Sequence, residues 1–162
     1  MTGAPAVLGA VALAAAAGVL GLLRLRRRFL VVTVHGESML PAYRPGERVV
    51  VRRTPAGALR AGQVVVLRGD GPAPGRNTAG REAPGAAQGP RARWIIKRVT
   101  AVPGDPIPRD TVPALRSAPG TRVPAGRLVV LGDNPERSHD SRHAGYLAAD
   151  RLYGVVLRKL GR

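Results

Sequence analysis

The sequence predicts a mainly β domain that follows one N-terminal transmembrane helix. Two observations lead to this fold class. Residues 4–23 form a run without a charged side chain, and six later runs of strand length are rich in β-branched residues and separated by turn residues. A chain of 162 residues is long enough for one domain with one core plus an appendage, and too short for two full domains.

The N-terminal segment has the length of a membrane span. Twenty residues at about 1.5 Å rise per residue cover about 30 Å, the thickness of a bilayer's hydrocarbon core. Arg24, Arg26, Arg27 and Arg28 follow directly and would lie among lipid headgroups. We therefore predict a transmembrane helix over 4–23 and a lipid bilayer as partner. A cleaved signal peptide and a buried Ala-rich core helix are the alternatives, although no basic residue precedes the apolar run.

Residues 29–162 are predicted to form a β-rich domain. Short apolar runs punctuated by Gly and Pro are typical of all-β or mainly β domains. Between positions 69 and 90 there are 6 Gly and 4 Pro in 22 residues, so this stretch is predicted to be a flexible insertion without a core of its own. The predicted strands cover residues 29–34, 47–52, 63–67, 94–100, 127–131 and 152–158.

Composition limits the classes of partner and cofactor. The formal net charge is +16, but 24 of the 26 basic residues are Arg in a chain that is also rich in Gly, Pro and Ala, which is typical of a GC-rich genome. Aromatic residues make up only 3%, so stacking on single-stranded nucleic acid is not expected. The absence of Cys excludes disulfides, thiolate metal sites and Cys catalysis. We expect no nucleic-acid partner, no metal and no cofactor.

Ser38 is the first candidate for catalysis. It lies just after the first predicted strand, between Gly36, which allows a sharp turn, and Pro41, which fixes the exit of the chain. A Ser at such a junction has an exposed hydroxyl with backbone N–H groups nearby, as a nucleophile with an oxyanion hole requires. Many turn serines only bond their own backbone, so this feature is weak when taken alone.

Lys97 is the second candidate, because it lies inside a predicted strand. Strand alternation places its side chain on the same face as Ile95 and Val99. Burial disfavours the charged form of a lysine and lowers its pKa, so a buried Lys97 could accept a proton from a serine hydroxyl. The alternative is an edge-strand lysine whose amine extends to water. Arg98 points to the opposite face and cannot act as a base.

A third polar cluster lies between the last two predicted strands, over residues 131–145. It contains Ser138, Asp140 and Arg142 at alternating positions, so it could orient a neighbouring site. Asp140 and Arg142 are close enough for a local ion pair. If the pair is exposed it contributes about 0–1 kcal/mol, which favours a geometric role.

These three segments together resemble the type I signal peptidase family of membrane-bound Ser/Lys endopeptidases. The resemblance rests on Gly36-Glu37-Ser38-Met39-Leu40-Pro41, on Ile96-Lys97-Arg98-Val99 through Pro103-Gly104-Asp105, and on Gly132-Asp133-Asn134 through Ser138, Asp140-Ser141-Arg142 and Gly145. It covers position 31 to the C-terminus and leaves 69–90 unmatched. It implies a compact antiparallel β-sheet domain.

The resemblance also implies roles for single residues. Ser38 would be the nucleophile and Lys97 the general base. Ser138 would hydrogen-bond the Lys97 amine, and Asp140 and Arg142 would support that loop, together with the Asp133-Asn134 pair of the same motif. Gly36 stands where some members carry a hydroxyl donor to the oxyanion, so the Ser38 backbone N–H would act without it.

The implied function is removal of signal peptides from exported preproteins, with small residues such as Ala-X-Ala preferred at the cleavage site. This function places the catalytic domain outside the cytoplasm, whereas the Arg cluster after the apolar run favours a cytoplasmic domain. The oligomeric state is not predicted.

Four other interpretations compete with the dyad. A Ser-His-Asp triad would combine Ser38 with His35, His139 or His143 and with Asp140. A metal site at His139 and His143 lacks an evident third ligand. Self-cleaving repressors share the Ser/Lys chemistry but would need an N-terminal DNA-binding domain. A membrane-anchored basic module that binds anionic lipid or nucleic acid without catalysis would rest on the net charge alone.

Overall fold

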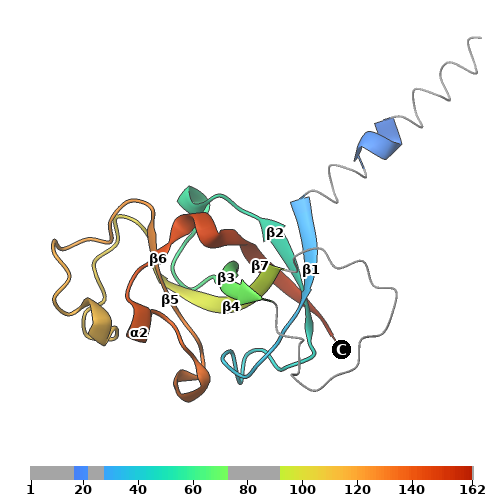
Figure 1. Cartoon of the computed structure of the whole chain (residues 1–162). Helices are drawn as coiled ribbons and strands as arrows, with labels where there is room; N and C mark the ends of the chain where they lie inside the picture. Colours follow the sequence, from blue (N-terminus) through green and yellow to red (C-terminus); the bar gives the residue numbers. More distant parts are fainter. Residues whose placement is uncertain (1–16, 22–27, 73–91, 162) are drawn as a thin grey trace, which may run out of the picture.

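The computed structural model describes residues 17–21, 28–72 and 92–161, and these contain one twisted antiparallel sheet (Figure 1). In this part of the chain the sheet has seven strands in the order β1-β2-β7-β3-β4-β5-β6. All neighbouring strands pair antiparallel. The strands are β1 (Phe29–Thr33), β2 (Arg48–Arg53), β3 (Val64–Pro72), β4 (Ala92–Ala101), β5 (Arg127–Leu131), β6 (Leu147–Ala148) and β7 (Leu152–Gly161). The mainly β, antiparallel fold class is thereby confirmed.

The six predicted strands correspond to β1 to β5 and β7. Besides short 3-10 turns, one strand and one α-helix in this part of the chain were not predicted, the two-residue strand β6 and the short helix α2 (Ser141–Ala144). Both are too short to show a hydrophobic period. Pairing with Arg127 and Leu128 of β5 creates β6, and the Asp140 side chain caps α2 by accepting from the Arg142 N–H. A tertiary contact therefore stabilises β6 and a side-chain cap stabilises α2, although the local sequence predicts neither element.

The predicted membrane segment lies almost wholly outside the described residues. Of positions 4–23 only 17–21 are described, and they are helical. None of the helices within the described ranges is both long and apolar enough to cross a bilayer. The transmembrane helix thus stays a prediction. Of the predicted insertion, residues 69–72 belong to β3, and the remainder lies outside the described part of the chain.

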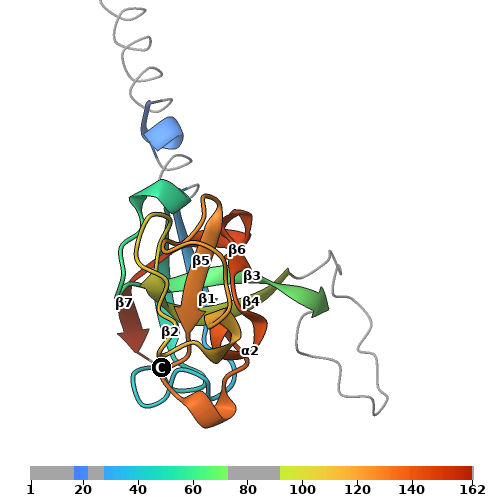
Figure 2. The same ribbon diagram turned by 90° about the vertical axis from the view of Figure 1, so that its left-hand side faces the viewer.

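The two faces of the sheet, which Figure 2 shows turned by 90° from Figure 1, bury separate apolar clusters. Ile96 packs on one face with Val32 of β1 and with Val34, which follows that strand. Val99, with Ile95 beside it, packs on the other. Lys97 belongs to the second face, as strand alternation predicts. A third cluster fills the space under the loops between β4 and β5, around Val112, Val123 and Val129.

Candidate active site

Lys97 is held at the centre of the sheet. On β4 it pairs with Val65 of β3, while the next residue, Arg98, pairs with Leu131 of β5, so both edges of the strand are bonded near the lysine. The residue is only 5% exposed. It lines a cavity of about 270 Å³ whose wall also includes Ile95, Val130 and Leu147. The aliphatic stem of the lysine therefore lies in apolar surroundings, and the predicted burial is present.

A buried hydrogen-bond chain begins at the Lys97 amine. Lys97 Nζ donates to Ser138 Oγ at 2.8 Å, and Ser138 Oγ donates to Asp140 Oδ2 at 2.6 Å. Ser138 and Asp140 are both buried. A hydroxyl has a single proton, so a Ser138 that donates to the carboxylate presents a lone pair to the amine. The chain therefore fixes the direction in which the Lys97 amine points.

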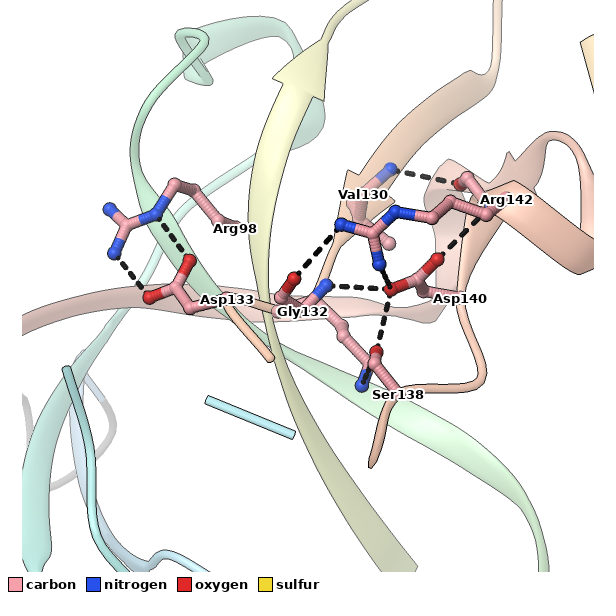
Figure 3. Close-up of polar contacts among 9 residues, drawn as sticks. Arg98, Val130, Gly132, Asp133, Ser138, Asp140 and Arg142 are labelled. Carbon is pink, nitrogen blue, oxygen red and sulfur yellow. Dashed lines mark hydrogen bonds and ion pairs between the residues drawn. The ribbon is translucent and has the colours of Figure 1, made fainter. Parts of the chain in front are cut away.

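Asp140 connects the surrounding loop, as Figure 3 shows. Its Oδ2 accepts from the Gly132 N–H at 2.8 Å and from Arg142 Nη1 at 2.8 Å, and its Oδ1 accepts from the Arg142 N–H at 3.0 Å. Arg142 Nη2 also donates to the Gly132 carbonyl at 3.2 Å. The predicted Asp140–Arg142 pair forms, but it is not an exposed one, because the Asp140 side chain is fully buried. The estimate for an exposed pair therefore does not apply.

The surroundings of the Lys97 amine disfavour its protonated form. Burial lowers the pKa of the Lys97 amine below its ordinary value, the negative charge of Asp140 partly offsets that effect, and the positive charge of Arg142 adds to it. Burial alone would raise the pKa of Asp140. Hydrogen bonds from the Gly132 N–H, the Ser138 hydroxyl and the Arg142 N–H outweigh that effect, so the Asp140 pKa is lowered. The site therefore holds a buried amine that loses its proton more readily than an ordinary lysine, beside a carboxylate that ionises more readily than an ordinary aspartate.

Ser38 lies in the turn that follows β1. Gly36 has a φ of 75°, in the left-handed region that favours glycine. Met39, which is 1% exposed, anchors the turn in the first apolar cluster. Asn134 ties the turn to the loop after β5, because its N–H donates to the Ser38 carbonyl at 3.0 Å and its side-chain amide donates to the Glu37 carbonyl at 3.2 Å. The Ser38 turn and the Gly132-Asp133-Asn134 segment are thus docked together.

Gly132 shows how closely the two parts of the site approach each other. A Cβ added to Gly132 would lie 2.3 Å from Ser138 Oγ and 2.5 Å from the Ser38 carbonyl oxygen. Gly132 therefore lies directly between two parts of the site. One is the Ser138 hydroxyl, which accepts a hydrogen bond from the Lys97 amine, and the other is the backbone of Ser38. Only a residue without a side chain fits between them.

Arg98 and Asp133 form a second link next to the first. Arg98 Nε donates to Asp133 Oδ1 at 2.8 Å and Nη2 donates to Oδ2 at 2.7 Å, a bidentate pair that Figure 3 shows beside the Asp140 network. Arg98 Nη1 donates in addition to the Gly62 carbonyl at 3.0 Å. This pair holds the start of the loop after β5 against β4, one residue from Lys97. Its partial exposure limits its contribution to stability.

Some of the predicted catalytic and metal-binding residues do not contact each other through hydrogen bonds in the described part of the chain. Across residues 28–72 and 92–161, the Ser38 hydroxyl forms no hydrogen bond, and the Lys97 amine donates to Ser138 instead. No histidine there bonds Ser38 or Asp140. His139 and His143 are exposed and stack on each other with ring centroids 5.2 Å apart. The described residues contain no group of three or more residues able to hold a metal ion. The geometry thus gives the triad and metal interpretations no support.

For three residues of this site the sequence predicted no individual role. They are Gly132, Arg98 as the partner of Asp133, and Ser141, which is fully buried and accepts from the Val130 N–H at 3.0 Å. Arg98 was considered only as a possible base. The opposite charge of Asp133, at the end of the neighbouring strand, was the available signal. Gly132 and Ser141 belong to the motif that carries the family resemblance, but their roles could not be predicted from it, because they depend on which segments approach each other in the fold.

Comparison with known proteins identifies the family. The family model "Signal peptidase, peptidase S26" matches residues 7–113 and 109–159. The chain is 29% identical over 160 residues to Signal peptidase IB of Staphylococcus aureus strain COL, with 76% of this chain and 73% of that protein covered. The proteins of the same name from strains Mu50 and N315 match with the same identity and coverage. The chain therefore belongs to the signal peptidase family, peptidase S26, whose membership implies serine endopeptidase activity.

Proposed function

We propose that this protein is a membrane-anchored serine endopeptidase that removes signal peptides from exported preproteins, with Ser38 as nucleophile and Lys97 as general base. The observation that carries the proposal is the buried Lys97 amine, which is aimed by Ser138 and whose pKa is lowered by burial. A lysine can serve as a base near neutral pH only when its environment disfavours the ammonium form. Family membership supports the reaction class.

The first chemical step is attack of the Ser38 hydroxyl on the scissile carbonyl. Neutral Lys97 accepts the hydroxyl proton as the new C–O bond forms, and the resulting ammonium then gives that proton to the departing amine when the C–N bond breaks. Ser138 and Asp140 have a positioning role in this step. Asp140 is already ionised and keeps the Ser138 proton directed at itself, so Ser138 always offers a lone pair to Lys97.

The second step returns the enzyme to its starting state. Lys97, neutral again after protonating the leaving group, removes a proton from a water molecule that attacks the acyl-enzyme. The C–O bond to Ser38 breaks, and the proton passes to the Ser38 oxygen. The Ser38 backbone N–H forms no hydrogen bond within the described ranges, so it is free to donate to the oxyanion in both steps. The Asn134 contacts to the Ser38 and Glu37 carbonyls support the orientation of that N–H.

The substrate is proposed to be an exported preprotein, extended along a strand edge and cleaved after small residues. An anchor over residues 4–23 would confine enzyme and substrate to one membrane surface and so raise their effective concentration. We place the catalytic domain on the extracytoplasmic side, where preproteins emerge. Protease treatment of intact cells tests this placement, since it should degrade the C-terminal domain and leave a cytoplasmic control protein intact. A protected domain would refute the placement.

Cleavage of a preprotein by the detergent-solubilised full chain tests the dyad. We expect Ser38→Ala and Lys97→Met to abolish cleavage. The matched controls are Ser117→Ala, an exposed serine, and Lys159→Met, the only other lysine in the chain, and both should retain full activity. Mass spectrometry of the acid-quenched wild-type reaction should find the acyl group on the peptide that contains Ser38. Cleavage by either dyad variant at the wild-type rate would exclude the mechanism.

A further inference from the structure

A second cavity, of about 380 Å³, lies away from Lys97 at one end of the sheet. Its lining comes from the end of β2, from β3 and from the start of β7, and consists of Arg53, Thr54, Pro55, Arg68, Leu152 and Tyr153. Neither Ser38 nor Lys97 contributes to it. The peptidase chemistry therefore leaves this cavity unexplained.

The cavity combines two cations with an aromatic wall. The Arg53 guanidinium carbon lies 4.9 Å from the centre of the Tyr153 ring, and that ring packs edge-on against Trp94 with centroids 4.7 Å apart. Arg53 and Arg68 are both exposed. Neither is paired with a carboxylate from the described ranges. Two guanidinium groups without counter-ions at one cavity are suited to a phosphate, whose oxygens match the planar fork of arginine.

The position of the cavity indicates where the phosphate would come from. Phe29, the first residue of β1, pairs with Arg52, so the chain enters the sheet at the same end as Arg53 (Figure 1). Arg28 precedes it and is exposed. Five residues separate the predicted membrane segment from β1 and can span at most roughly 18 Å. If the predicted segment over 4–23 spans a bilayer, this end of the sheet lies within reach of the headgroup layer.

We propose that this cavity binds the phosphate group of an anionic phospholipid. Arg53 and Arg68 would hold the phosphate, and Pro55 and Leu152 would contact the glycerol and the first methylene groups of the lipid. Trp94 and Tyr153 are residue types that favour the membrane–water interface. The inference goes beyond the proposed peptidase function and is tested by binding, so its failure and that of the proposed function are separable.

The test uses the fluorescence of Trp94, the only tryptophan in the chain. Full-length protein in non-ionic detergent is titrated with short-chain phosphatidylglycerol, with short-chain phosphatidylcholine and with inorganic phosphate. We expect a saturable change with phosphatidylglycerol at the lowest concentration. Arg53→Gln combined with Arg68→Gln should weaken this binding roughly 30-fold, because each arginine near an anionic membrane surface raises the affinity about fivefold. Replacing both with lysine keeps the charge but not the planar fork, so it should restore only part of the binding.

A matched double variant controls for charge. Arg116 and Arg127 are exposed and do not line the cavity, so their replacement by glutamine removes the same charge and should leave binding unchanged. Three results would overturn the proposal. They are phosphatidylglycerol binding by the Arg53/Arg68 glutamine variant within twofold of wild type, an equal loss in the Arg116/Arg127 variant, and inorganic phosphate or phosphatidylcholine binding as tightly as phosphatidylglycerol.

Discussion

Replacement of Gly132 by alanine tests whether the Ser38 turn and the Lys97 network depend on one close contact. The added methyl carbon would lie 2.3 Å from Ser138 Oγ, 2.7 Å from Ser138 Cβ and 2.5 Å from the Ser38 carbonyl oxygen. Ordinary contacts of a Cβ begin near 3.4 Å, so the neighbours must retreat by about 1 Å. Overpacking of this kind costs about 1–3 kcal/mol of unfolding free energy.

The loss of activity should exceed what the loss of stability explains. Ser138 cannot move by that amount and keep its 2.8 Å bond to Lys97 and its 2.6 Å bond to Asp140. A displacement of about 1 Å at a reacting centre costs about 100-fold in rate. We therefore expect Gly132→Ala to lower kcat/KM for a preprotein by about 100-fold at a temperature where the variant is fully folded.

Two other glycines provide matched controls. At Gly57 an added Cβ meets nothing within 4 Å, so Gly57→Ala should change neither stability nor rate. At Gly154 it would lie 2.1 Å from the Arg52 carbonyl oxygen, in the β2–β7 pair, so Gly154→Ala should lower the free energy of unfolding and leave the folded fraction active. Denaturant unfolding and initial rates measure both quantities. Two results would refute the idea that the close contact at Gly132 positions the site. One is a wild-type rate in Gly132→Ala, and the other is a loss of rate in folded Gly154→Ala as large as that in Gly132→Ala.

Three further predictions concern the groups around Lys97. In the proposed mechanism neutral Lys97 is the base and burial lowers its pKa, so kcat/KM should rise with pH along a single acidic limb whose midpoint lies below the ordinary lysine value. A limb at that ordinary value would contradict the burial argument. Arg142 also lowers the pKa of Lys97, so Arg142→Gln should move that limb to higher pH, whereas a shift to lower pH would show that the charge acts otherwise. Asp133→Asn removes the ion pair with Arg98 and should lower kcat/KM several-fold with under about 1 kcal/mol of destabilisation, and an unchanged rate would assign the pair no positioning role.

Stability should also respond to the ionisation of Lys97. The folded state lowers the pKa of this amine, so between the folded-state pKa and the ordinary value of 10.5 the unfolded chain binds more protons than the folded one. Stability therefore rises with pH through that window. Below the window Lys97 is protonated in the folded state as well, and the fold bears the full cost of burying the charged amine. The slope has the same sign for Asp140, whose pKa is also lowered, but its window lies in the acid range: the ionised carboxylate stabilises the fold above the ordinary carboxyl range, and that contribution is lost as the pH falls.

Most of the sheet could be predicted because its strands are continuous β-branched runs. The run over 127–131 matches β5 residue for residue, and the alternation in β4 correctly placed Lys97 with Ile95 and Val99. The ends of β3 and β4 could not be predicted, because Gly69 to Pro72 have poor strand propensity, and Pro72 pairs with Ala92 only beyond an irregularity in the ladder. The burial of Asp140 was missed for a related reason, since a polar turn reads as solvated until the fold packs it against Gly132.

The partners that set the state of the Lys97 amine come from one short stretch of chain. Gly132, Ser138, Asp140 and Arg142 lie within a single loop and the first turn of α2, whereas Lys97 belongs to the middle of the sheet. Burial in the sheet has the largest effect on the pKa of the Lys97 amine, and the charges of Asp140 and Arg142 in this loop adjust it. Exchange of this loop between relatives offers a way to adapt the enzyme to acidic or alkaline surroundings without redesign of its core.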